Sequence, residues 1–170
     1  MKRMMVYLLI GFTIFMLSCA GKTDRDLYES AKKSIENEKY AEALTQFEEL
    51  VKNYPNSEYY QDALLQTGEL YQGHVNKNIP YKESLKKAIK SYRMFYSKYK
   101  DDPKAPQTLF MVGFIQANEL GQLDSARVTY SKFVEQYPDN EMTPSAKIEL
   151  ENLGLSPDEI LAKKIKNKSE

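Results

Sequence analysis

The sequence has 170 residues, of which 42% are hydrophobic and 28% are charged, and this composition favours one folded domain over a disordered tail or a polytopic membrane protein. Lys and Arg together number 24, as do Asp and Glu, so we expect no nucleic-acid partner. A single Cys and a single His exclude a disulfide framework within the chain and most Cys- or His-based metal and catalytic sites. We therefore expect no metal and no cofactor.

The first 18 residues have the pattern of an export signal. Lys2 and Arg3 precede an apolar run over residues 6–17, and this run is shorter than the roughly 20 residues that a membrane-spanning helix needs. A positive start followed by a short apolar run is typical of a secretory signal peptide. Residues 1–18 are therefore predicted to be a signal peptide.

The only cysteine, Cys19, directly follows this run, and the small residue Ser18 precedes it. Residues 16–21 resemble the lipobox of bacterial lipoproteins. The resemblance implies cleavage before Cys19, acylation of its thiol and amino group, and membrane attachment through the acyl chains. An ordinary signal peptide that leaves Cys19 as a free thiol is the alternative. Because Ala20 and Gly21 follow instead of the Asp that retains many lipoproteins in the inner membrane, the resemblance favours an outer-membrane anchor facing the periplasm, with residues 19–26 as the tether.

Three segments of the remaining chain repeat one spacing. In each, an alanine is followed four residues later by an aromatic residue, seven later by Leu or Phe and eleven later by Tyr. Spacings of three and four place these side chains on one face of a helix. A small residue in a preceding helix lies 12, 20 or 13 residues before the alanine, so the middle copy has an insertion around residues 73–81 and the last copy has one extra residue. The predicted repeat-packing residues are Ala31, Ala43 and Phe47, then Gly68, Ala88 and Tyr92, then Gly113, Ala126 and Tyr130.

This pattern resembles the tetratricopeptide repeat, a pair of antiparallel helices. The long junctions after the Tyr-Pro pairs at residues 54–55 and 137–138 look like the variant found in envelope lipoproteins of the outer-membrane β-barrel assembly type. The resemblance implies an all-α fold, a right-handed solenoid of about three helix pairs over residues 27–153, followed by a C-terminal capping helix and Lys-rich tail over residues 154–170. We expect no strand, and helices near residues 24–36, 40–54, 58–72, 82–99, 104–119, 123–136, 144–153 and 157–167.

The first helix of each pair lines the concave wall of such a solenoid, so positions counted from its small residue give a candidate groove. They carry aromatic, apolar and a few polar side chains, which suit a peptide or helix with hydrophobic anchors. For Leu65 and Phe110 the alternative remains open that they are core residues. The candidate protein-binding groove consists of Tyr28, Lys32, Leu65, Glu69, Phe110, Phe114 and Asn118.

The sequence predicts a binding protein rather than an enzyme. It has no Gly-rich phosphate loop, no nucleophile elbow and no His-Glu zinc signature, and His74 in the inserted loop has no second His with which to share a metal. With the family resemblance, this indicates a lipid-anchored scaffold that assists outer-membrane protein assembly by docking envelope proteins or peptides in the groove, with no small-molecule substrate. A cell-division or peptidoglycan coordinator and a secretion pilotin with the same fold are alternatives, and an enzyme or ligand-binding lipoprotein that uses residues 73–81 is another.

Overall fold

The computed structural model describes residues 21–169, and every regular element in that range is helical. The all-α, helical-repeat prediction is confirmed, and the helix bounds agree with those expected to within about two residues, as is usual for helix ends. The signal peptide and Cys19 lie outside the described residues. In chain order the elements are α2 (Asp24–Glu36), α3 (Tyr40–Asn53), α4 (Tyr60–Gln72), α5 (Tyr81–Lys98), α6 (Ala105–Phe114), the π-helix η1 (Ile115–Glu119), α7 (Leu123–Gln136), α8 (Thr143–Asn152) and α9 (Pro157–Ser169).

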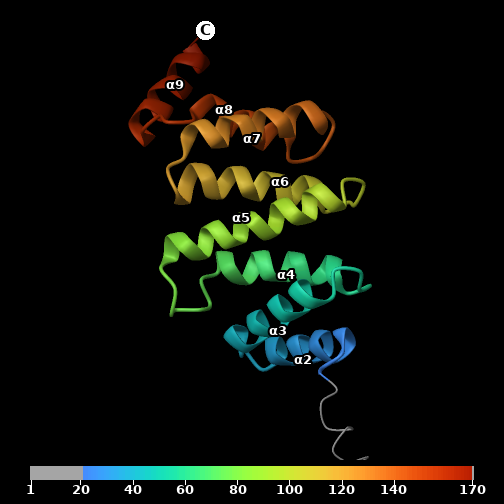
Figure 1. Cartoon of the computed structure of the whole chain (residues 1–170). Coiled ribbons are helices and arrows are strands. Elements are labelled where there is room, and N and C mark those ends of the chain that lie inside the picture. The colour runs from blue at the N-terminus through green and yellow to red at the C-terminus, as the bar shows by residue number, and fades with distance from the viewer. Residues whose placement is uncertain (1–20, 170) are drawn as a thin grey trace, which may run out of the picture.

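The helices from α2 to α8 form one stack, in which each helix packs mainly against its neighbours in sequence (Figure 1). The three pairs are α2 with α3, α4 with α5, and α6 with α7. We call the first member of each pair the A helix and the second the B helix. Because no helix pair buries its apolar face alone, each pair depends on the next one for its core, as in other solenoid proteins.

Local sequence signals fix several helix ends. Thr23 and Asp26 form a capping box at the start of α2, in which each side chain accepts a hydrogen bond from the other residue's backbone N–H. Ser156 and Glu159 form the equivalent box at α9. Gly121, which follows η1, has a φ of +64°, a left-handed conformation that glycine adopts without steric cost.

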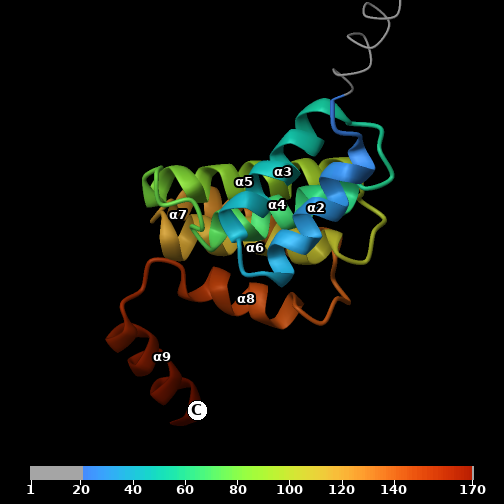
Figure 2. The ribbon, with the colours of Figure 1, turned by 90° about the horizontal axis from the view of Figure 1, so that it is seen from below.

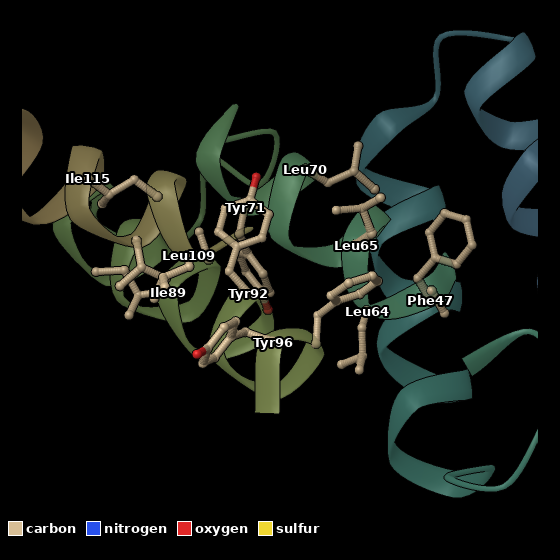
Figure 3. Close-up of a cluster of buried hydrophobic side chains, with 14 of the residues drawn as sticks. Phe47, Leu64, Leu65, Leu70, Tyr71, Ile89, Tyr92, Tyr96, Leu109 and Ile115 are labelled. Carbon is tan, nitrogen blue, oxygen red and sulfur yellow. The ribbon is translucent and has the colours of Figure 1, made fainter. Parts of the chain in front are cut away.

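The contact within each pair joins a small residue of the A helix to an aromatic ring of the B helix. Gly68 of α4 lies so close to Tyr92 of α5 that a Cβ atom at this position would come within 2.6 Å of the ring. A Cβ on Gly113 of α6 would come within 2.8 Å of the Tyr130 ring on α7. The structure buries all nine predicted repeat-packing residues. Figure 3 shows part of this core, with Leu64, Leu65 and Leu70 of α4 between Phe47 of α3 and Tyr92 of α5.

The extra residue of the third pair is taken up by η1. Its wider turn is closed by a hydrogen bond from the Leu120 N–H to the Ile115 carbonyl oxygen, five residues back (3.0 Å). A π-turn of this kind accommodates one additional residue in a helix. Gly113 and Tyr130 therefore meet as Gly68 and Tyr92 do, although the third pair is one residue longer than the first between these elements.

The C-terminal end differs from the expected cap. Helix α8 packs on α7, but α9 stands away from the stack (Figures 1 and 2). Leu161 and Ile165 of α9 are 58% and 62% exposed, and Ile148 of α8 is 55% exposed. The prediction that the last helix caps the solenoid is thus corrected: α8 covers α7, whereas α9 adds little buried surface. Its large apolar residues are three, Ile160, Leu161 and Ile165, on a Lys-rich helix.

Filling the space of the two packing glycines should destabilise the protein. Alanine favours a helix over glycine by about 1 kcal/mol, but in Gly68→Ala and Gly113→Ala the new methyl group must displace a buried tyrosine ring, which costs about 1–3 kcal/mol. We expect each variant to melt several degrees lower by circular dichroism. Gly73→Ala, at the end of α4 with no atom nearer than 3.5 Å to the new Cβ, is the matched control and should change little. Unchanged melting of both packing variants would contradict this contact.

The two tyrosines on these glycines differ in one respect that mutation can test. The Tyr92 hydroxyl donates a hydrogen bond to Gln72 Oε1 (2.9 Å), whereas the buried Tyr130 hydroxyl has no hydrogen-bond partner among the described residues. Tyr92→Phe should therefore lower the free energy of unfolding by about 0.5–1.5 kcal/mol, while Tyr130→Phe should be neutral or stabilising. Urea denaturation measures both. Equal losses in the two variants would show that Tyr130 has a partner after all.

Candidate functional site

The exposed side of the three A helices forms one continuous surface, which we call the A-helix face. Its residues recur at the same positions relative to Ala31, Gly68 and Gly113, so side chains of successive pairs lie in rows across the stack. All are exposed or half-buried. The face consists of Arg25, Glu29, Lys32 and Glu36 of α2, Asp62, Gln66 and Glu69 of α4, and Gln107, Met111 and Phe114 of α6 with Asn118 of η1.

Tyr28 joins the first two pairs at the edge of this face. Its ring stacks on Tyr59 with centroids 4.5 Å apart and meets Phe47 edge-on at 6.1 Å. Its hydroxyl donates a hydrogen bond to Asp62 Oδ2 (2.9 Å). Burial and this hydrogen bond raise the pKa of Tyr28 to about 12. Tyr28 is therefore chiefly a junction residue between α2 and α4, and only its outer edge is accessible.

Charges from three A helices meet around Glu69. The Glu69 side chain is exposed to solvent, but the surrounding protein partly desolvates its carboxylate. This desolvation, together with the negative charge of Asp62, raises the pKa of Glu69 above its ordinary value. Lys104 and Lys32 oppose the shift. The four charged groups come from α2, from α4 and from the residue before α6, which places the three A helices side by side on one face.

The seven predicted groove residues fall into two groups. Leu65 is only 4% exposed and belongs to the core, which was the open alternative for this residue. Phe110 is half-buried, because its ring packs edge-on against Tyr130 (5.4 Å) and Phe133 (5.9 Å). Lys32, Glu69, Phe114 and Asn118 remain accessible, and with Tyr28 and Phe110 they lie on or beside the A-helix face.

Met111 is the main residue of this face that sequence reasoning missed. It lies one turn before Phe114, is half-buried, and extends the apolar part of the face along α6. Its position in the sequence, two residues before Gly113, could have identified Met111 as a residue of this face. The face thus changes along the stack, from charged side chains on α2 to Met111 and Phe114 on α6, and the latter can serve as hydrophobic anchors for a bound segment.

Two open hollows lie outside most of this face. One of about 500 Å³ is lined by the loops around Tyr40 and Val75. Another of about 580 Å³ lies where α8 turns into α9, near Leu123 and Ile160, and reaches the face only at Asn118. The inserted loop is ordered by His74, whose Nε2 lies 2.9 Å from the Ile79 carbonyl oxygen. Among residues 21–169, no group of three or more His, Cys, Asp or Glu side chains is arranged to hold a metal ion. The A-helix face presents accessible side chains on three successive helix pairs, an arrangement that suits a peptide or a helix.

The family of the protein follows from its sequence over these same elements. Residues 20–164 match the YfiO family, described as outer membrane lipoprotein. The chain belongs to this family. The match begins directly after Cys19 and includes all three helix pairs, and it confirms the predicted family. A comparison with curated proteins found no match.

In this outer membrane lipoprotein, none of the helices between residues 21 and 169 combines the length and the apolar character that a bilayer crossing requires. Apolar side chains of the described residues instead build the helix stack, where the large side chains with the least exposure, such as Phe47, Phe95, Tyr130 and Phe133, lie between neighbouring helices.

The tyrosines of this lipoprotein predict a loss of stability in alkali. Burial raises the pKa of Tyr92 and of Tyr130 well above 10, and the pKa of Tyr28 is about 12. A group whose pKa is higher in the folded state gives its full stabilisation below the unfolded pKa, here about 10, and loses it as the pH rises. The free energy of unfolding should therefore fall above about pH 10. Urea titrations between about pH 9 and 11.5 measure it, and a flat profile would contradict the buried, protonated state of these rings.

Proposed function

We propose that this protein is a non-catalytic scaffold, anchored to the outer membrane by acylated Cys19 and facing the periplasm, that assists outer-membrane protein assembly by docking segments of envelope proteins. Membership of an outer membrane lipoprotein family supports the membrane and the anchor. The helical-repeat fold supports docking, because stacked repeats present an extended surface for protein segments.

The observation that carries the docking role is the continuity of the A-helix face over three helix pairs. A bound segment would place apolar side chains against Met111 and Phe114 and polar side chains near Lys32 and Glu69. An extended or helical segment suits a face that continues over three helix pairs better than a small molecule, which needs an enclosed pocket.

The short segment between Cys19 and the first helix pair would hold that pair close to the membrane. The Tyr54 hydroxyl donates a hydrogen bond to the Lys22 carbonyl oxygen (2.6 Å), which holds the backbone to the first helix pair at this residue. From Cys19 to Lys22 the chain can extend over roughly 10 Å at most. An acylated Cys19 would therefore keep the start of α2 and the end of α3 close to the bilayer.

The test replaces Phe114 by Glu in cells that depend on this protein and measures the amount of β-barrel protein in the outer membrane. A buried negative charge should abolish docking of an apolar anchor, so β-barrel levels should fall toward those of cells without the protein. Val128→Glu is the matched control, since Val128 lies on α7, is 70% exposed and receives the same charge.

Both variants should be checked for helix content and membrane attachment, so that a loss of docking is separated from unfolding or release. Normal β-barrel levels with Phe114→Glu, in cells where removal of the whole protein lowers them, would contradict docking on the A-helix face. Failure of the wild-type protein to incorporate a palmitate analogue would contradict the anchor.

A further inference from the structure

The outer side of α5 carries a row of cations. Lys82, Lys86, Lys90 and Arg93 recur at spacings of four, four and three residues, so they lie on one side of the helix over about 16 Å. All four are exposed, while the opposite side of α5 is buried against the neighbouring helices. We call these four residues the α5 cation row.

The charges of this row are not neutralised by neighbouring acids. Among the described residues, the side chains of Lys82, Lys86 and Lys90 make no ion pair and no hydrogen bond, and the one acidic residue of α5 is Glu83. In the orientation in which the Gln116 amide nitrogen donates to the Thr129 hydroxyl, Arg93 donates a hydrogen bond to the Gln116 amide oxygen at 3.0 Å. Because Gln116 is neutral, this contact leaves the charge of Arg93 unpaired. The row therefore presents four positive charges to any approaching group.

Lys87, which lies beside the row, shows the contrast. Its Nζ atom is 3.9 Å from Glu48 Oε1, donates a hydrogen bond to the Tyr71 hydroxyl (3.0 Å) and lies 5.0 Å from the centre of the Tyr71 ring. This lysine is already engaged between α3, α4 and α5. The α5 cation row differs from Lys87 because no acidic side chain in the described part of the chain forms an ion pair with the row.

A groove with a partly apolar lining runs beside the row. It has a volume of about 370 Å³ and lies between α3, α4 and α5. Val51 and Met94, both half-buried, give it an apolar lining, and Lys52, Lys90 and the paired Glu48 and Lys87 also line it. Methionine adapts its shape to varied partners. The α5 cation row and this groove together combine positive charge with a hydrophobic contact.

The helices on either side of α5 decide which kind of partner fits. The flanking B helices carry no excess of exposed positive charge, since α3 has Glu42 and Glu49 against Lys52, and α7 has Asp124 and Glu135 against Arg127 and Lys132. A broad anionic surface, such as a lipid bilayer, would therefore be attracted by α5 but gain no net attraction from its neighbours. A single helix that lies along α5 would meet the row alone.

We propose that the α5 cation row and the adjacent groove bind an acidic amphipathic helix of a partner protein. Carboxylates at helical spacing would pair with Lys86, Lys90 and Arg93, and an apolar side chain one row aside would contact Val51 and Met94. This site lies on a B helix and is separate from the A-helix face. It does not depend on acylation of Cys19 or on a role in outer-membrane assembly.

The test uses the full mature chain in detergent and a fluorescent synthetic peptide of 18 residues. The peptide carries Glu at positions i, i+4, i+8 and i+11 and Leu on the adjacent flank, and fluorescence anisotropy measures its binding. We expect binding to weaken at least about tenfold in the double variant Lys86→Glu, Lys90→Glu. Met94→Asp should also weaken it. Lys33→Glu, Lys147→Glu, which makes the same change in net charge at exposed positions on α2 and α8, should stay within about twofold of wild type.

Several results would overturn the proposal. They are failure of the wild-type chain to bind the peptide, an equal loss in the control double variant, and equal binding of a peptide with Lys in place of Glu. Vesicles of phosphatidylglycerol and phosphatidylcholine are a further probe. Binding to them that is lost in Lys86→Glu, Lys90→Glu, without binding of the peptide, would assign the row to a lipid surface and overturn the protein partner.

Discussion

The structure depends on one contact, an aromatic ring of a B helix that packs on a residue with little or no side chain in the A helix. Tyr92 on Gly68 and Tyr130 on Gly113 leave no space for a Cβ atom, and Ala31 and Phe47 are the fully buried equivalents in the first pair. This close approach fixes the rotation of each helix about its axis. With the rotation fixed, the positions that face outward on α2, α4 and α6 are also fixed, and the A-helix face follows from the same register.

The two ends of the stack are finished differently. At the N-terminal end the outer side of α2 and α3 is polar, where Gln46 Nε2 donates a hydrogen bond to Ser30 Oγ (2.9 Å) and the Ser34 hydroxyl donates to Gln46 Oε1 (3.2 Å). At the C-terminal end Ile148, Leu161 and Ile165 remain exposed, and α9 contacts the stack only sparsely. Since each helix relies on its neighbours, the free energy of local opening should be lowest at α9 and highest in the middle of the stack.

Most of the fold could be predicted from the sequence, because the helical period and the repeated small and aromatic residues report the packing directly. The details that depend on three-dimensional shape could not. Whether Leu65 lines a surface or fills the core depends on how closely neighbouring helices approach. The π-turn at η1 was visible only as one extra residue, and the position of α9 depends on how little surface Leu161 and Ile165 would bury. The Lys residues of α5 were ordinary surface residues in the sequence, and only the neighbouring charges and groove distinguish them.

Native-state hydrogen exchange of the whole chain, resolved by helix, tests most directly whether contacts between neighbouring pairs hold the stack together. If the small-on-aromatic contact holds the stack together, amides of α4 and α5 around Gly68 and Tyr92, which have neighbours on both sides, should exchange most slowly. Protection should decrease through α7 and α8 and be nearly absent in α9. Uniform protection from α2 to α9, or faster exchange in α4 and α5 than in the terminal helices, would contradict a stack whose stability arises from contacts between neighbouring pairs.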